Sequence, residues 1–405
     1  MQEHSHEDGR GGGRERVDAA PVGTLPEDAH AAVLVGRVWD PRTGGPSPVV
    51  VRDGVVHDLS AVVATVSELA DAPDPVALVT EAPPHPLGTV EDVVANARSG
   101  TRDPDRPWIL SPVDLQAVKA AGVTFAASLM ERVIEERAGG DAAAASAVRE
   151  EITRLVGAEV RDVVPGSDAA LRIRDAMLAA GTWGPYLEVG LGTDAEIFTK
   201  GQPLSTVGTG DDVGVLAASD WNNPEPEVAL VVSSAGRVVG ATLANDVNLR
   251  DVEGRSALLL GRAKDANASG AVGPFIRLLD EGFGMDDVRA LRVSLAVDGA
   301  DGYALRAVSD MSLISRDPLD LVRQLIGPHH SYPDGALLML GTMFAPTDDR
   351  DAPGRGFTHH RDDVVRISSP RLGTLENHVR AAEDCAPWTF GVRALMRHLS
   401  ERGTR

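Results

Sequence analysis

Several features that would place a sequence in a class at once are scarce here. Cys385 is the only cysteine, so no internal disulfide bond can form, which fits a reducing cytoplasm. No apolar run approaches membrane-spanning length, and residues 1–16 lack the apolar core of a signal peptide. Basic residues are too few to balance the acidic ones, and a net charge of −21 argues against nucleic acids and anionic membranes as partners. The composition therefore predicts a globular cytoplasmic protein.

The chain is long enough for more than one domain. Its 405 residues are 43% apolar, which is ordinary for a globular protein with a sizeable core. Residues 1–27 are polar and glycine-rich, which predicts a disordered tail. We expect a small α+β domain over 28–107, a helical lead-in segment over 108–180 and a β-rich domain over 181–405. The fold class is therefore α+β, with helices dominating before residue 180 and a rolled mixed β-sheet after it.

Hydrophobic periodicity predicts the individual elements outside the central hairpin. Helices are expected at residues 65–70, over most of 111–157, and at 167–180 and 318–326. Strands are expected at residues 32–38, 76–80, 289–297, 303–308 and 336–340, with a hairpin at 49–57 around Arg52-Asp53-Gly54.

The most informative stretch predicts an antiparallel hairpin. Two apolar, β-branched runs flank a small break at Ser234-Ala235-Gly236. Side chains alternate along a strand, so Glu225 and Glu227 face the same side. With the turn centred on the break, Glu225 lies opposite about residue 245. Asp246 therefore arrives at the open end of the hairpin beside both glutamates.

Three carboxylates in one small site need compensation, because like charges raise each other's pKa. A hard divalent cation supplies it, and Mg²⁺ or Mn²⁺ prefers oxygen ligands. Spacing alone leaves a second interpretation open, in which Glu225, Glu227 and Asp246 are exposed acids at strand ends in a chain with 60 acidic residues.

Four motifs in this order resemble those of the fumarylacetoacetate hydrolase family: Glu225-Pro226-Glu227, the run from Asn245 to Arg255, Ala263-Lys264 and Gly273-Pro274-Phe275. The resemblance covers about Leu110 to the C-terminus and looks closest to the branch that dehydrates 2-keto-3-deoxy sugar acids. It implies that 181–405 is a catalytic domain with a rolled mixed β-sheet, that the protein is a homo-oligomer, most often a dimer, and that a small 2-keto acid is its substrate. It also implies that Glu225, Glu227 and Asp246 hold Mg²⁺ or Mn²⁺.

The resemblance extends to candidate catalytic and substrate-binding residues. Lys264 would reach into the metal pocket and neutralise an enolate, or act as a base if its pKa falls. Glu196 would serve as acid or base, although it could instead be a surface acid beside Lys200. Substrate contacts are implied for five residues: Arg250, Gly341, Thr342, Thr124 and His330. For Arg250 an ion pair with Asp251 or Glu253, and for His330 a surface position, stay open as alternatives.

The expected reaction depends on a histidine that is missing. Many family hydrolases carry a catalytic His soon after a motif equivalent to Gly122-Val123-Thr124-Phe125, but no His occurs between His85 and His329. We therefore expect dehydration of 2-keto-3-deoxy-D-xylonate or -arabinonate to 2-oxoglutarate semialdehyde. Both names are given because D-xylonate and D-arabinonate yield the same 2-keto-3-deoxy compound. The alternatives are a metal-dependent C–C hydrolase of a 2,4-diketo acid, a keto-enol isomerase or decarboxylase, and an inactive binding protein.

Overall fold

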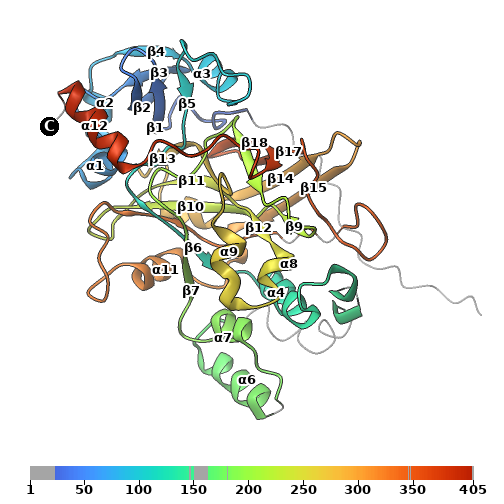
Figure 1. Ribbon diagram of the computed structural model, residues 1–405. Coiled ribbons are helices and arrows are strands. Elements are labelled where there is room, and N and C mark those ends of the chain that lie inside the picture. The colour runs from blue at the N-terminus through green and yellow to red at the C-terminus, as the bar shows by residue number, and fades with distance from the viewer. Residues whose placement is uncertain are drawn as a thin grey trace, which may run out of the picture.

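The computed structural model describes residues 23–145, 147–149, 163–179, 181–344, 346 and 348–403. Helices and strands are interspersed along this part of the chain (Figure 1), which confirms the α+β class. Strands β1 to β6 precede residue 180, so the expectation that helices dominate there is wrong. None of the helices in the described ranges has the length and apolar character needed to cross a membrane.

Within the described residues, eleven strands form one mixed sheet in the order β4-β3-β2-β1-β13-β11-β10-β16-β6-β7, with β5 paired to β1. Their bounds are β1 Leu34–Asp40, β2 Gly45–Arg52, β3 Val55–Asp58, β4 Pro86–Thr89, β5 Trp108–Ile109, β6 Ala117–Gly122, β7 Glu196–Gly201, β10 Pro226–Val232, β11 Val238–Asp246, β13 Gly270–Leu278 and β16 Ala336–Met339. Strands β16 and β6 run parallel, and the predicted hairpin, β10–β11, lies near the middle.

A second mixed sheet has the order β15-β14-β17-β18-β8, and β9 pairs with β12 in a short ribbon. Their bounds are β8 Asp212–Val215, β9 Asn222–Asn223, β12 Asn248–Leu249, β14 Arg292–Asp298, β15 Ala304–Asp310, β17 Val364–Ser369 and β18 Gly373–Ala381. The strands predicted at 289–297, 303–308 and 336–340 are thus present, with ends shifted by a few residues.

Helices cover the ends of this β-structure. Their bounds are α1 Val66–Asp71, α2 Pro75–Glu81, α3 Val90–Ala95, α4 Ala126–Ala138, α6 Asp168–Ala179, α7 Pro185–Leu191, α8 Arg250–Glu253, α9 Leu260–Lys264, α10 Met285–Arg289, α11 Pro318–Leu325 and α12 Val392–Arg402, with 3-10 turns at Ala257–Leu259 and Met311–Leu313. The C-terminal helix α12 lies against the N-terminal strands (Figure 1), where Arg402 donates hydrogen bonds to Ser47 and Asp58.

Two predicted elements are wrong in type. Residues 76–80 lie in helix α2, not in a strand, because Asp74 caps its N-terminus and Pro75 occupies its first turn. The helix expected from residue 111 onward begins only at Ala126; residues 117–122 form strand β6 instead. Strand β6 lies between β16 and β7, and pairing on both sides overrides its local helix propensity.

Some predicted segments lie outside the described residues. They are residues 1–22 of the predicted tail and most of the helix expected to resume near residue 142. Of the remaining tail residues, Thr24 accepts a hydrogen bond from Thr374, and Glu27 donates one to Pro370.

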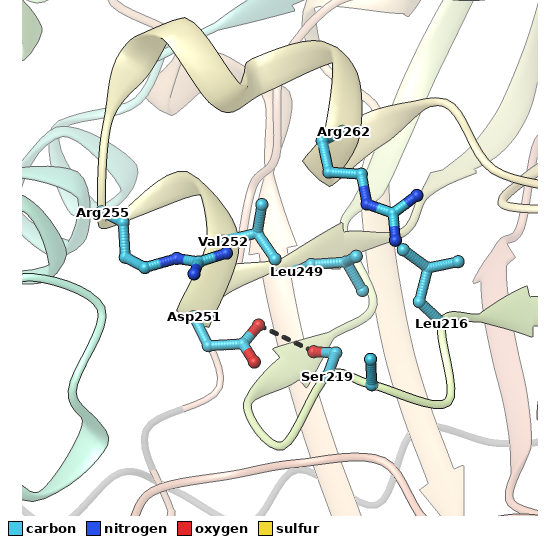
Figure 2. Close-up of a pocket in the computed structure, with 8 residues that line it drawn as sticks. Leu216, Ser219, Leu249, Asp251, Val252, Arg255 and Arg262 are labelled. Carbon is cyan, nitrogen blue, oxygen red and sulfur yellow. Dashed lines mark hydrogen bonds between the residues drawn. The ribbon is translucent and has the colours of Figure 1, made fainter.

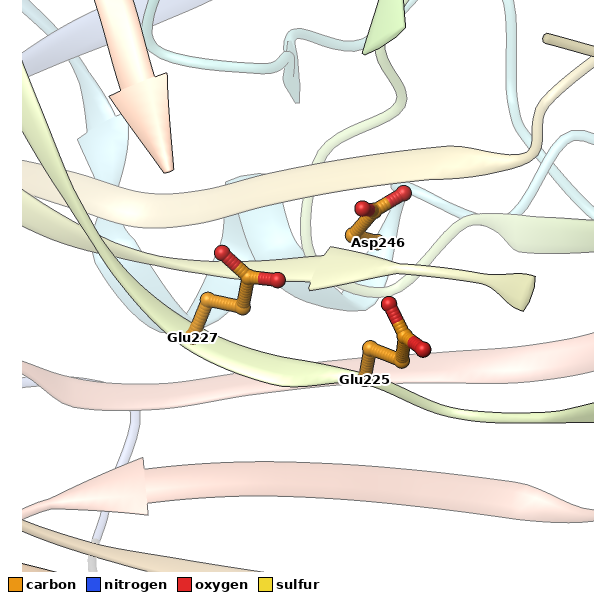
Figure 3. A group of neighbouring side chains, drawn as sticks. All are labelled: Glu225, Glu227 and Asp246. Carbon is orange, nitrogen blue, oxygen red and sulfur yellow. The ribbon is translucent and has the colours of Figure 1, made fainter. Parts of the chain in front are cut away.

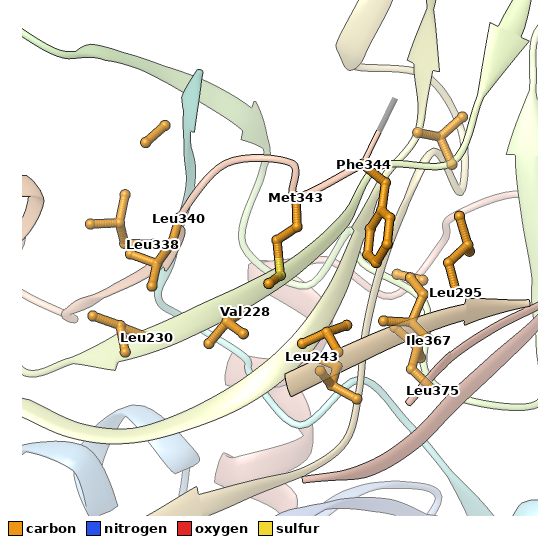
Figure 4. Packing of buried hydrophobic residues seen from close by; sticks show 14 of the residues in the cluster. Val228, Leu230, Leu243, Leu295, Leu338, Leu340, Met343, Phe344, Ile367 and Leu375 are labelled. Carbon is orange, nitrogen blue, oxygen red and sulfur yellow. The ribbon is translucent and has the colours of Figure 1, made fainter. Parts of the chain in front are cut away.

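The hairpin is buried on both faces. On one face Val228, Leu230 and Leu243 belong to a cluster that also contains Leu295 and Ile367 of the second sheet (Figure 4). On the other face Ala229, Val231 and Ala244 pack in a separate cluster with residues of the N-terminal strands and α1. Because the side-chain period of a strand is two, this double burial sets the register and determines the face on which each polar residue of the hairpin lies.

Candidate active site

The hairpin brings three acidic side chains together at its open end (Figure 3). Pro226 pairs with Asn245, and the Asp246 N–H donates to the Glu225 carbonyl at 3.0 Å, within one residue of the predicted register. Glu227 lies in β10, Glu225 directly precedes that strand, and Asp246 is the last residue of β11. One carboxylate oxygen from each lies within 4.8 Å of the others. We call these three residues the acidic triad.

The acidic triad is buried. Glu225 is 3% exposed, and Glu227 and Asp246 are each 1% exposed, so the interpretation as surface acids at strand ends is wrong. Burying carboxylates is costly unless cations or hydrogen bonds compensate them. Lys264 Nζ bonds to Glu225 and lies 3.1 Å from Asp246 Oδ2, and Lys200 Nζ lies 2.9 Å from Asp246 Oδ1.

Glu227 is the least compensated of the three. Among the described residues, its hydrogen-bond donor is the Gly341 N–H, at 2.7 Å. Burial, followed by the charges of Asp246 and Glu225, raises the pKa of Glu227 well above its usual value. A donor set made only of carboxylate oxygens, one of them without a cationic partner, fits a hard divalent cation. The acidic triad could therefore bind a metal.

Lys264 lies beside the acidic triad, where the family resemblance implied it. Burial alone would lower the pKa of its ammonium group, but the carboxylates of Asp246, Glu225 and Glu253 outweigh that effect and raise the pKa. In the metal-free protein the pKa of Lys264 therefore does not fall, as the alternative base role would require. Lys264 carries a charged ammonium at the edge of the acidic triad.

Two cationic residues of the site were missed at the sequence level. Arg132 of α4 pairs with Glu225 and with Glu135, and Lys200 of β7 bonds to Asp246 and to the carbonyl of Val247. A signal for Lys200 was present, because it lies four residues after Glu196 on one strand and so shares its face. Arg132 offered none, since it lies 93 positions before Glu225.

Glu196 shares the face of the acidic triad. Along β7, Ile197 packs against the cluster between the sheets while Phe198 packs against the cluster on the triad's face, so Glu196 and Lys200 point with Phe198. Burial is the main cause that raises the pKa of Glu196, with Arg132 and Lys264 acting in the opposite direction. A carboxyl group in this state keeps its proton to higher pH and can donate it. The surface-acid alternative is wrong.

Three predicted substrate residues lie where β16 ends. Gly341 adopts a φ of +101° and directs its N–H to Glu227. Thr124 Oγ1 donates to the Leu340 carbonyl at 2.6 Å, and Thr342 Oγ1 donates to the Phe344 carbonyl at 2.8 Å. The structure thus connects Gly341 to the acidic triad directly and places the two threonines in the adjoining backbone. Their contact with a substrate carboxylate stays a prediction.

The other two predicted substrate residues need correction. Arg250 is buried, with its guanidinium bonded to Glu131, Glu135 and the Pro346 carbonyl, so it joins α8 to α4 instead of presenting its cation to a substrate. Its partners are also not the Asp251 and Glu253 that the alternative named. His330 is exposed and stacks edge-on against Tyr332, in the loop that precedes β16. Gly341 follows the opposite end of that strand, so the structure does not bring His330 to the site.

Glu253 supplies a pH prediction for the metal-free protein. Burial raises its pKa to about 7, against the attraction of Arg132 and Lys264. The folded state then binds more protons than the unfolded state between about pH 4.5 and 7, so the stability that this group contributes falls as pH rises through that window. The measurement is the free energy of unfolding in urea, with a chelator present, at pH values across that window. As the pH rises, this free energy should fall by up to about 3 kcal/mol more in the parent than in Glu253→Gln.

The exposed Glu91 provides the control for this measurement. Glu91→Gln should keep the full pH dependence of the parent. An identical slope in Glu253→Gln and in the parent would contradict the raised pKa.

A separate cavity of about 410 Å³ is lined by side chains from residues 216–219, β12 and the region of α8 and α9 (Figure 2). Its lining includes Leu249, Val252, Arg255 and Arg262, and none of the acidic triad. The cavity is therefore distinct from the candidate metal site, although α9 contributes Arg262 to the cavity and Lys264 to the acidic triad.

Comparison with known proteins identifies one family model. Residues 191–380 match the fumarylacetoacetate (FAA) hydrolase C-terminal family. A probable 2-keto-3-deoxyxylonate dehydratase of Haloferax volcanii is 29% identical over 194 residues, which are 48% of this chain and 63% of that protein. A 2-dehydro-3-deoxy-D-arabinonate dehydratase of Saccharolobus solfataricus is 30% identical over 185 residues, 46% of this chain and 58% of that protein. The matches thus span about six tenths of each relative's length.

Solved structures show a similar fold over a longer stretch. A 2-keto-3-deoxy-D-arabinonate dehydratase in its apo form aligns with a TM-score of 0.60 at 20% identity, covering 86% of this chain and 99% of that one. The same values hold for a 2-keto-3-deoxy-D-arabinonate dehydratase complexed with magnesium and 2,5-dioxopentanoate. At this identity the likeness concerns the fold alone.

Proposed function

Because the chain belongs, through residues 191–380, to the fumarylacetoacetate hydrolase family, we propose that it is a divalent-metal-dependent dehydratase of 2-keto-3-deoxy sugar acids. The substrate we propose is 2-keto-3-deoxy-D-xylonate or -arabinonate, and the product is 2-oxoglutarate semialdehyde. That product is the same compound as the 2,5-dioxopentanoate held by the magnesium-bound solved structure. The homo-oligomer and the cytoplasmic location expected from the sequence stay predictions.

The observation that carries the proposal is the pairing of a buried acidic triad with a carboxyl group of raised pKa on the same face. Dehydration requires a proton for the departing hydroxyl group, and Glu196 is in a state to provide it. Cleavage of a carbon–carbon bond requires a base that activates water. In the described part of the chain, the carboxylates of the acidic triad pair with lysine, arginine and backbone amide groups, and with no histidine.

The residues then have separate tasks. When bound by the acidic triad, Mg²⁺ or Mn²⁺ would supply a Lewis acid for the carboxylate and 2-keto oxygens of the substrate. The Lys264 ammonium would stabilise the negative charge that develops on the 2-keto oxygen as the C3 proton passes to a solvent water. Glu196 protonates the C4 hydroxyl group, which departs as water. Loss of water leaves a C3=C4 double bond conjugated with the 2-keto group. A proton then moves from C5 to C3, and the resulting C4=C5 enol takes a proton at C4 to become the C5 aldehyde.

Product identification tests the proposal. The protein is incubated with Mg²⁺ and 2-keto-3-deoxy-D-xylonate, and the products are followed by mass spectrometry. We expect the semialdehyde, 18 mass units lighter than the substrate because one water is lost, and no pyruvate. Pyruvate from a 2,4-diketo acid, with no turnover of the deoxy sugar acid, would establish the C–C hydrolase instead.

Glu196→Gln is the matched variant for this assay. It removes the proton while keeping the shape of the side chain, so semialdehyde formation should fall by about 10²-fold or more. Binding of Mn²⁺ should stay close to that of the parent, because Glu196 is not one of the triad residues. Loss of Mn²⁺ binding would assign Glu196 to the metal site instead of to proton transfer.

A further inference from the structure

Asparagines beside the acidic triad retain buried amide atoms without a partner in the described part of the chain. They are Asn223 Oδ1, Asn245 Nδ2, and both Oδ1 and Nδ2 of Asn248. Asn223 is 3% exposed, and the other two are fully buried. Buried polar groups in folded proteins are nearly always hydrogen-bonded, so a cluster of free donors and acceptors indicates a place where something polar binds.

The direction of Asn248 follows from its neighbours. Val247 and Leu249 both belong to the apolar cluster between the two sheets. Because side chains alternate along an extended chain, Asn248 points to the opposite face. That is the face of Asp246, which lies two residues earlier, about 7 Å along the strand. The fully buried amide of Asn248 is therefore directed toward the side of the acidic triad.

Asn223 joins Asn248 on that face. The two residues are register partners in the β9–β12 ribbon. Side chains of directly paired residues lie on one side of a sheet with their Cβ atoms about 5 Å apart. Asn223 also precedes Glu225 by two residues. We call Asn223 and Asn248 the amide pair. Asn245 is set apart, because its Oδ1 already accepts the Glu225 N–H and its side chain alternates to the other face.

The chemistry of the amide pair matches a hydroxyl group. Asn248 offers a free acceptor and a free donor at one position, and a hydroxyl group needs both. Asn223 adds a free acceptor, because its Nδ2 already donates to the Pro224 carbonyl at 2.9 Å. The carboxylate and keto oxygens of a 2-keto acid only accept. We propose that Asn223 and Asn248 form a subsite that binds a chain hydroxyl of the substrate and selects a hydroxylated 2-keto acid over one with an alkyl chain. This inference rests on the function proposed above and names the group that its substrate must carry.

A site of this kind discriminates strongly. An analogue that lacks the hydroxyl group leaves the buried amides unpaired, which costs more than the loss of an ordinary contact. An apolar side chain of similar size in place of Asn248 should therefore weaken binding of the hydroxylated acid and leave that of the alkyl acid unchanged.

The test compares two ligands of equal carbon number, 2-keto-3-deoxy-D-xylonate and 2-oxopentanoate. Binding is measured by calorimetry with Mg²⁺ present, in the Glu196→Gln background, so that turnover does not consume the ligand. The background protein should bind the hydroxylated acid about tenfold more tightly. Asn248→Leu and Asn223→Leu should each bring the ratio of the two affinities, called the ligand ratio below, close to one. An unchanged ratio in both variants overturns the proposal.

A thermal measurement separates recognition from a structural role. Replacing an unpaired buried amide by an apolar side chain should leave the melting temperature unchanged or raise it. Asn96→Leu is the matched control, because the Asn96 amide donates to the carbonyls of Asp103 and Arg106. That variant should lose stability and keep the ligand ratio. A lowered melting temperature in Asn248→Leu with an unchanged ratio would make Asn248 a structural residue only.

The outcomes also separate this inference from the proposed function. If the parent forms no semialdehyde but the ligand ratio responds to Asn248→Leu, the subsite stands and the dehydratase proposal fails. If semialdehyde forms and the ratio does not respond, the subsite alone fails. If neither acid binds, both fail.

Discussion

Replacing Glu227 with glutamine is expected to remove divalent metal binding and turnover without destabilising the metal-free protein. Burial and its two acidic neighbours already raise the pKa of Glu227, so the carboxylate is unfavourable there when no cation is bound. Glutamine keeps the acceptor for the Gly341 N–H and removes that charge. The affinity for Mn²⁺, measured by electron paramagnetic resonance, should fall by about a hundredfold, and turnover should fall with it.

Unfolding measurements complete this experiment. At a metal concentration of about 100 times Kd, the parent should gain about 2.7 kcal/mol of stability, and Glu227→Gln at the same concentration almost none. Glu376→Gln is the control, because Glu376 pairs with Arg366 on the second sheet. Parent-like Mn²⁺ affinity in Glu227→Gln would exclude the acidic triad as the metal site.

Lys264→Met is expected to lower kcat by about 10²- to 10³-fold while metal affinity stays the same or rises. The ammonium group contacts Glu225 and Asp246, so in the metal-free protein it compensates two of the carboxylates that a metal would use. Methionine removes a cation that repels the incoming metal, and it also removes the charge that would stabilise an enolate. The measurement is kcat with saturating substrate beside a Mn²⁺ titration.

Without metal, Lys264→Met should be less stable than the metal-free parent. Two buried carboxylates lose a cationic partner, which costs about 3 to 5 kcal/mol, and added Mg²⁺ should restore part of that stability. Lys119→Met is the control, because the Lys119 ammonium donates to Thr199 Oγ1 at 2.6 Å, and not to the acidic triad. Turnover close to that of the parent in Lys264→Met would rule out the proposed role.

Local patterns carried most of what the sequence predicted correctly. The hairpin, its register and the convergence of Glu225, Glu227 and Asp246 depend only on alternation and on a short turn. The predicted type of secondary structure was wrong where the hydrophobic pattern was ambiguous. Residues 76–80 are apolar and β-branched, yet a capping Asp74 makes them helical, and residues 117–122 are alanine-rich, yet pairing on both sides makes them a strand.

The pairing of charges in the site shows more clearly what local sequence patterns could not predict. Arg132 reaches Glu225 from a helix 93 positions away, and Arg250 is engaged by two glutamates of that same helix. The sequence places Arg250 next to Asp251 and Glu253, and neither is its partner in the structure. Which acid a buried cation meets depends on how separate elements pack, because a charge removed from water must find its compensation in three dimensions.

By itself, the sequence determined which acids share a strand face, because that depends on the parity of residue numbers, and it determined the family-like order of motifs from Glu225 to Pro274. Only the tertiary structure decided that these acids are buried, that Lys200 and Arg132 join Lys264 around them, and that His330 stays at the far end of β16. Burial and long-range pairing arise when sheets and helices pack together, and no local period of the chain encodes them.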